Sequence, residues 1–162
     1  MLKTKINNIL GICCYHLLPI KQEFYTGRGT IIGICTLSSL DLLEKITCSQ
    51  EIMDKILIAG RLLSENKGID RIIKFTNYNK SLKHLLLCGE EVKGHLAGQT
   101  LIALKKNGTY QNKKVINAPS PYPFLASTTE EIEYFVNHIN IINNIGLKEI
   151  DQIKDIVFDF LN

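Results

Sequence analysis

Residues 82–108 have the sequence LKHLLLCGEEVKGHLAGQTLIALKKNG, and this stretch indicates the fold class. The apolar run Leu82–Cys88 is short enough for a buried strand, and a glycine breaks it at once. After a glycine-rich loop, leucine and alanine recur at helical spacing over Leu96–Leu104, and Asn107-Gly108 is typical of a helix end. The stretch therefore predicts a strand, a loop and a helix in succession, the repeating unit of a parallel α/β sheet.

The chain before this unit shows the same alternation. The run Ile31–Thr36 predicts a buried strand followed by a polar loop. Apolar residues at helical spacing over Ile52–Leu63 predict a helix that ends in the polar stretch 64–68, closed by a glycine. The next segment, Ile69–Thr76, favours a short helix, with a strand as the competing interpretation because of its β-branched residues.

The chain after this unit continues the pattern. Val115-Ile116 predicts the centre of a third strand, and three prolines within 118–123 exclude both a helix and a central strand there. The hydroxyl and carboxylate residues at Thr128–Glu131 are typical of a helix start, and helical spacing continues to Ile142. A last helix is expected over about 148–160. We therefore predict a single α/β domain with a mostly parallel sheet flanked by helices.

The composition is that of an ordinary globular protein. Lys and Arg number 19 against 16 Asp and Glu, which gives a net charge of +3, and 45% of the 162 residues are hydrophobic. The lysines are interleaved with acids and form no basic stripe, so we expect no nucleic-acid partner. The five cysteines contain no C-x-x-C pair, which excludes a zinc ribbon or a thioredoxin motif and indicates a reducing compartment.

The amino terminus superficially resembles a signal peptide, with two lysines before the apolar run Ile6–Ile20. Polar residues interrupt this run and no small-x-small cleavage site follows, so we expect a packing segment. No stretch approaches the ~20 apolar residues that span a bilayer. We expect a cytoplasmic protein with no membrane span.

The most informative motif is the loop Cys88–Gln99, because ligands of parallel sheets bind outside the carboxyl ends of the strands. Gly89 and Gly94 are spaced as in a phosphate-binding loop, but His95 and Leu96 stand where such a loop needs Lys and Ser or Thr. The loop is therefore not a Walker-type phosphate-binding loop.

His95 is the candidate metal ligand of this loop. A helix N-terminus beside it favours a neutral imidazole, which can coordinate a metal. No second His or Cys stands at metal-ligand spacing, so a metal held in a macrocycle, which needs one axial ligand, is the natural candidate: a corrinoid or a haem. A structural or merely exposed histidine is the alternative.

Two neighbouring features leave open whether His95 is a metal ligand. Residues 95–98 match half of the D-x-H-x-x-G signature of cobalamin-binding domains, with Lys93 at the aspartate position. A carboxylate partner for the histidine would then have to come from Glu90, Glu91 or elsewhere. Glu65-Asn66 is a polar ligand contact or a helix exit, and its spacing favours the helix exit.

Taken in chain order, these segments resemble the A subunit of the tetrahydromethanopterin S-methyltransferase complex of methanogenic archaea. The resemblance covers roughly Pro19 to Phe135 and is most specific around the histidine loop. The residues that carry it are Ile34–Ser39, Ile58–Leu62, Ser64–Arg71, Leu86–Gln99, Ala103-Leu104, Asn107-Gly108 and Pro123–Leu125.

The resemblance implies a Rossmann-like domain that binds a cobamide, with His95 as the lower axial ligand of cobalt. In that family the cobalt carries a methyl group from methyl-tetrahydromethanopterin towards coenzyme M, a step of methanogenesis. The chain would then be the corrinoid-carrying component of a methyltransferase, with partner subunits that donate or accept the methyl group. The alternative is a corrinoid storage or sensor module without methyl turnover.

The site expected from this resemblance combines glycines that allow close approach with polar contacts. No catalytic residue is assigned. The expected cofactor-binding positions are Thr36, Leu37, Ser38, Ser39, Asn66, Gly68, Gly89, Glu91, Gly94, His95, Gly98, Gln99, Ala118 and Pro119.

Two departures from the family qualify the expectation. The family's membrane-bound member ends in a transmembrane helix, whereas this sequence ends with an amphipathic segment at 153–158, so a stand-alone cytoplasmic homologue is expected. The glycine-rich loop of the family is replaced by residues 117–122, so cofactor contacts there differ. The expected organisation is an N-terminal extension over 1–18 and a corrinoid-binding domain over 19–162.

Overall fold

The computed structural model describes residues 24–161, and the expectations for residues 1–18 and for the signal-like run lie outside them. The β-strands are β1 (Phe24–Thr26), β2 (Ile32–Cys35), β3 (Ile58–Gly60), β4 (His84–Leu87) and β5 (Asn140–Asn143). The helices are α2 (Leu40–Cys48), α3 (Gln50–Met53), α4 (Lys67–Tyr78), α5 (Ala97–Asn107), α6 (Thr129–His138) and α7 (Ile150–Asp159).

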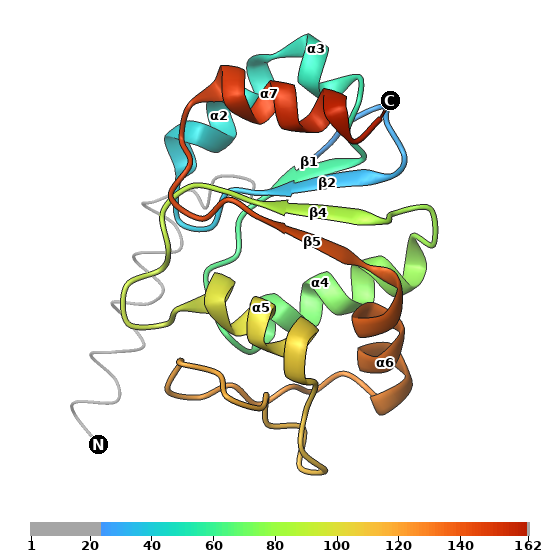
Figure 1. Ribbon diagram of the computed structural model, residues 1–162, viewed down its shortest axis with the longest axis vertical. Coiled ribbons are helices and arrows are strands. Elements are labelled where there is room, and N and C mark those ends of the chain that lie inside the picture. Colours follow the sequence, from blue (N-terminus) through green and yellow to red (C-terminus); the bar gives the residue numbers. More distant parts are fainter. Residues whose placement is uncertain (1–23, 162) are drawn as a thin grey trace, which may run out of the picture.

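The five strands form one sheet in the order β1-β3-β2-β4-β5. β1 pairs antiparallel with β3, and the other neighbours are parallel. α2, α3 and α7 cover one face of the sheet, and α4, α5 and α6 cover the other (Figure 1). The predicted mostly parallel, helix-flanked α/β domain is confirmed.

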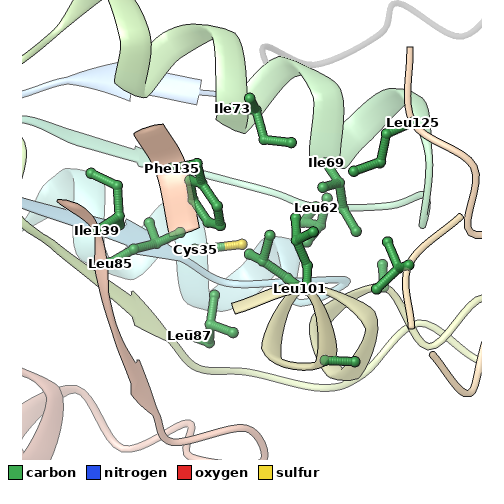
Figure 2. Packing of buried hydrophobic residues seen from close by; sticks show 14 of the residues in the cluster. Cys35, Leu62, Ile69, Ile73, Leu85, Leu87, Leu101, Leu125, Phe135 and Ile139 are labelled. Atoms are coloured by element: carbon green, nitrogen blue, oxygen red, sulfur yellow. The ribbon is translucent and has the colours of Figure 1, made fainter. Parts of the chain in front are cut away.

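Both faces of the central strands are buried, as expected for a parallel sheet between two helix layers. In β4 and just after it, Leu85 and Leu87 pack with α4, α5 and α6, whereas Leu86 and Cys88 pack with α2 and α7. Figure 2 shows the first of these clusters, in which Phe135 of α6 lies among side chains of the sheet and of α4. The side chains of the apolar run 85–88 therefore alternate between the two faces of the sheet, and each face has its own hydrophobic core.

The unit predicted from residues 82–108 is confirmed. β4 leads through a loop to α5, which ends where the Gly108 N–H donates to the Leu104 carbonyl. Gly108 has a φ of 71°, a conformation that glycine adopts without strain. The helix start at Thr128 is confirmed by a full capping box with Glu131.

The predicted helix over 52–63 is wrong beyond its first residues. α3 ends at Met53, and residues 58–60 form β3, which pairs with β1 and β2. Ile52, Ile56 and Ala59 all enter the same buried cluster, from a helix, a turn and a strand in turn. Their spacing therefore shows that they face the same helix layer, but it does not indicate a continuous helix.

Three other expectations are corrected. The polar stretch 64–68 begins α4 and does not end a helix, because the Asn66 side chain accepts a hydrogen bond from the Lys67 N–H. The helix expected to continue to Ile142 ends at His138, because residues 140–143 pair with β4. Val115 and its neighbours make only isolated bridges with Thr109 and Phe124 and join no sheet strand. The segment 69–76 is helical, as favoured.

Candidate functional site

The strand order places a topological switch point between β2 and β4. From β2 the chain crosses to β3 on one side, and from β3 it returns past β2 to β4 on the other. Crevices at such points are where open α/β sheets bind ligands. The loop after β2, residues 36–39, and the loop after β4, residues 88–96, leave the sheet here.

These two loops are bonded to each other. The Ser38 N–H and hydroxyl both donate to the Glu90 carbonyl, at 3.1 Å and 2.8 Å, and the Glu90 N–H donates to the Ser39 hydroxyl at 2.8 Å. Gly89 has a φ of 75°, and a Cβ there would lie 2.4 Å from the Thr36 carbonyl oxygen. Glycine at residue 89 is therefore what allows the two loops to touch.

A third segment, after β5, holds the loop from the opposite side. The Gly89 N–H donates to the Leu147 carbonyl, and the Lys148 ammonium lies 2.7 Å from the Glu90 carboxylate. The hydrogen bond and the positive charge of Lys148 lower the pKa of Glu90, and Glu90 in turn raises the pKa of Lys148. Both side chains are exposed, so the pair orients the loop more than it stabilises the fold.

Glu91 orders the second half of the loop. Its carboxylate accepts hydrogen bonds from the N–H groups of Val92, Gly98 and Gln99, at 2.9–3.0 Å. Leu96, the N-cap residue of α5, makes no side-chain cap, so Glu91 satisfies these helix donors from outside the helix. The carboxylate oxygens of Glu91 are thus committed to the backbone of the histidine loop.

His95 lies at the outer end of this loop and is paired with a buried carboxylate. Its Nδ1 is 2.7 Å from Oε2 of Glu65, whose side chain is 3% exposed, whereas the His95 side chain is 54% exposed. The other Glu65 oxygen accepts a hydrogen bond from the Tyr122 N–H at 3.3 Å. An Nδ1–H that donates to the carboxylate leaves Nε2 as the ring nitrogen with a lone pair, and in the described part of the chain nothing bonds to Nε2.

Glu65 is the site residue that sequence reasoning missed. The carboxylate partner was sought at Glu90 or Glu91, and the helix-exit interpretation removed Glu65 from consideration. Glu65 instead lies between β3 and α4, at the carboxyl edge of the sheet. There its side chain meets His95, which lies on the loop after β4. The available signal was the Asn66 N-cap, which places residue 65 at this edge.

The structure gathers most of the expected positions around the histidine loop: Ser38, Ser39, Gly89, Glu91, Gly94, His95, Gly98 and Gln99. Ala118 and Pro119 belong to the segment beside α5, where the Ser120 hydroxyl lies 2.8 Å from that of Thr100. Thr36 is buried with its hydroxyl directed to the Gly60 carbonyl, and Leu37 is fully buried. Asn66 caps α4, so its amide oxygen is engaged by the backbone, and Gly68 lies in the first turn of that helix.

Nε2 of His95 is the ring nitrogen of this site that could coordinate a metal. Within residues 24–161 no group of three or more His, Cys, Asp or Glu could hold a metal ion. A metal-ligating histidine is commonly oriented by a carboxylate that accepts a hydrogen bond from its other ring nitrogen. Gly94, next to His95, has a φ of 79°, and an added Cβ there would have no neighbour within 4 Å.

The buried thiols contribute no nucleophile. Burial raises the pKa of Cys35 to about 12 and raises that of Cys88 further still. Both side chains pack in the cores as small apolar groups. Among the described helices, none is long and apolar enough to cross a membrane.

The chain is similar in sequence to methyltransferase subunits of methanogenic archaea. Over 144 residues the chain is 28% identical to the A subunit of a putative methyltransferase Mtx of Methanosarcina acetivorans, covering 88% of this chain and 68% of that protein. It is 32% identical over 104 residues to the corresponding Mtx protein of Methanosarcina mazei, covering 64% and 60%. To the first A subunit of the tetrahydromethanopterin S-methyltransferase of Methanothermobacter marburgensis it is 37% identical over 99 residues, covering 60% of this chain and 42% of that protein.

The chain thus spans between about two fifths and two thirds of the length of these relatives. The family model that matches is MtrA, the A subunit of tetrahydromethanopterin S-methyltransferase, and it covers residues 19–162. The resemblance seen in the sequence is therefore confirmed over the whole sheet and its helices, and the chain belongs to the MtrA family of tetrahydromethanopterin S-methyltransferase subunits.

Proposed function

We propose that this protein binds a cobamide at the carboxyl edge of its sheet, with His95 as the lower axial ligand of cobalt, and carries a methyl group between methyltransferase partners. The observation that supports this most is the pairing of His95 Nδ1 with the buried Glu65 carboxylate at 2.7 Å. Methyl transfer of the tetrahydromethanopterin to coenzyme M type is the reaction class proposed, in line with the names of the relatives.

Glu65 has a defined role in this proposal. Its buried carboxylate holds the proton on Nδ1, which orients the ring, presents Nε2 and makes the imidazole a stronger electron donor. The Tyr122 N–H bond fixes the second oxygen, so the carboxylate cannot rotate away. A cobalt corrinoid, when bound, supplies a metal centre that accepts and releases a methyl group.

The remaining loop residues shape the site. Ser38, Ser39 and the Leu147 carbonyl hold the backbone at residues 89–90, and Glu91 holds the backbone at residues 92, 98 and 99. These bonds keep His95 at one place relative to the sheet before a cofactor arrives. Such preorganisation reduces the entropy lost on binding.

An absorbance titration with hydroxocobalamin tests the proposal. The wild-type protein is expected to bind it with a change in the cobalt-ligand bands, and His95→Ala is expected to bind without that change. Glu65→Gln retains the imidazole but removes the negative charge, so we expect a loss of affinity of about 10- to 100-fold. His138→Ala is the matched control, because His138 is an exposed histidine of α6 outside the site.

Each alternative result has its own meaning. No binding by the wild-type protein would overturn the corrinoid proposal. Binding whose spectrum is the same in His95→Ala would overturn the axial assignment. Binding with the expected spectrum, but with no transfer of the methyl group from methylcobalamin to a thiol acceptor in the presence of methyltransferase partners, would favour the storage or sensor module instead.

A further inference from the structure

A cavity of about 630 Å³ lies between α4 and the side of the sheet that carries β1, β3 and β2. Its volume is in the range of small-molecule sites. The cavity is distinct from the histidine loop, since none of its described lining residues belongs to 88–99. Among the described lining residues, Ser64 is the nearest in sequence to Glu65, the partner of His95.

The cationic side chains of the lining gather towards one end of the cavity. Because α4 connects two parallel strands, its first turn lies at the carboxyl edge of the sheet and its last turn at the amino edge. Arg61, Lys67 and Arg71 line the first end. Ile72 and Phe75 line the second end, together with Leu82 and Leu85.

The charges at the polar end are all of one sign. The charged residues among the described lining are those three cations, with no carboxylate among them. The Nε of Arg61 is buried and has no hydrogen-bond partner within the described residues. A buried donor without a partner is costly, so an acceptor brought by a ligand would be favourable at this point.

We propose that this cavity binds an amphipathic anion, with its carboxylate, sulfonate or phosphate at Arg61 and Lys67 and its apolar body along Ile72 and Phe75. The charge complementarity selects an anion, and the apolar far end selects a molecule with an aromatic or aliphatic body. The α4 residues that line the cavity run from Lys67 to Thr76, which gives this wall a length of about 14 Å at 1.5 Å per residue. The cavity shares Gly68 with the positions expected to contact the corrinoid, but the proposal does not rest on corrinoid binding.

Two probes of matched shape test the proposal on the whole chain. 8-Anilinonaphthalene-1-sulfonate is an aromatic anion whose fluorescence rises in apolar sites, and N-phenyl-1-naphthylamine is the same molecule without the sulfonate. The anionic probe is expected to bind at one site per chain. Arg61→Gln should weaken the anionic probe about tenfold and leave the neutral probe unchanged.

Variants of two further residues locate the site. Ile72→Trp fills the apolar end and is expected to abolish binding of both probes. Lys74→Gln removes a cation from an exposed position of α4 outside the cavity and should change neither affinity. Circular dichroism of each variant establishes that the protein is folded.

Three results would overturn the proposal. The first is equal loss of both probes in Arg61→Gln, since the sulfonate would then not be recognised. The second is displacement of the anionic probe by hydroxocobalamin in a manner that requires His95, since the cavity would then be part of the cofactor site. The third is absence of binding of the anionic probe by the whole chain, since the cavity would then not be a site for an amphipathic anion.

Discussion

Gly89 and Gly94 share one backbone conformation in two different surroundings. Their φ angles are 75° and 79°, in the region that favours glycine. An added Cβ at Gly89 would lie 2.4 Å from the Thr36 carbonyl oxygen and 2.8 Å from the Ser39 hydroxyl, whereas one at Gly94 would meet nothing within 4 Å. Within this loop, Gly94 is required by the backbone conformation alone, whereas Gly89 is required by the backbone conformation and by close packing.

Alanine at each position measures the two effects. Gly94→Ala is expected to lower the free energy of unfolding by about 1 kcal/mol, from the left-handed conformation alone. Gly89→Ala adds a clash with backbone atoms of a second loop, so we expect a loss of about 3 kcal/mol or more. Urea unfolding followed by circular dichroism gives both values. Equal losses would show that the loops separate at no cost and that their contact does not constrain Gly89.

Glu65 shows what residue-level reasoning can and cannot find. A carboxylate near a histidine was expected, but the nearest ones along the chain, at residues 90 and 91, are used otherwise. Glu65 is 30 residues away and meets His95 only because β3 and β4 end at the same edge of the sheet. That the partner of His95 would be a carboxylate was predictable, but the topology of the sheet decided which carboxylate it is.

At the scale of the element, α5 depends on a cap that lies outside it. Helices commonly begin with Ser, Thr, Asp or Asn at the N-cap, but α5 has Leu96, with a φ of 45°. Glu91, on the loop, accepts two of the free N–H groups of the first turn. By contrast, α6 is capped locally by Thr128 and Glu131. The start of α5 is therefore coupled to the shape of the histidine loop.

Substitution of the two caps tests this coupling. Thr128→Ala should lower the free energy of unfolding by about 1 kcal/mol and leave amide exchange in the loop 92–96 unchanged. Glu91→Ala should cost about 2 kcal/mol, because it leaves three donors without a charged acceptor, and should also speed amide exchange at Val92, Gly98 and Gln99. Hydrogen exchange followed by NMR measures both. If exchange near His95 stays slow in Glu91→Ala, the loop is held by its other bonds alone.

Helical periodicity also has its limits at this scale. The apolar spacing over residues 52–63 and over 128–142 continues across two element boundaries, from α3 into β3 and from α6 into β5. In both cases the later residues are β-branched or small and find a neighbouring strand to pair with. A spacing pattern cannot contain this information, since the partner strand is supplied by another part of the chain.

At the scale of the whole molecule, the two helix layers exclude water from both faces of β2 and β4. Cys35 ends β2 and Cys88 directly follows β4, and the two side chains face opposite layers. Burial raises the pKa of Cys35 to about 12 and that of Cys88 in the same direction. Since the thiolate is the reactive form, both thiols should be unreactive until the protein opens.

Thiol labelling at pH 8 with Ellman's reagent, mapped by peptide mass spectrometry, measures this. Cys48 is exposed and is expected to react at once, whereas Cys35 and Cys88 should react roughly 10³-fold more slowly or only in urea. The raised pKa means that the thiolate fraction of Cys35 stays small until the pH approaches 12. Cys48→Ser serves as the control and should remove the rapid labelling of that peptide. Rapid labelling of Cys35 or Cys88 in native buffer would mean that one helix layer detaches readily from the sheet.

The sequence by itself determined the features that depend on neighbours along the chain. These are the strand, loop and helix of residues 82–108, the end of α5 at Gly108, the capping box at Thr128 and the candidate histidine. Each rests on contacts within a few residues or on an apolar run that needs burial, and such requirements are visible in one segment.

Only the tertiary structure decided what depends on pairing between distant segments. It placed β3 and β5 in the sheet, left Val115 outside it, and brought Glu65 to His95. Strand pairing and a carboxylate–imidazole contact gain their free energy from partners tens of residues away. No local pattern identifies those partners, because the order of the strands determines which loops meet at the edge of the sheet.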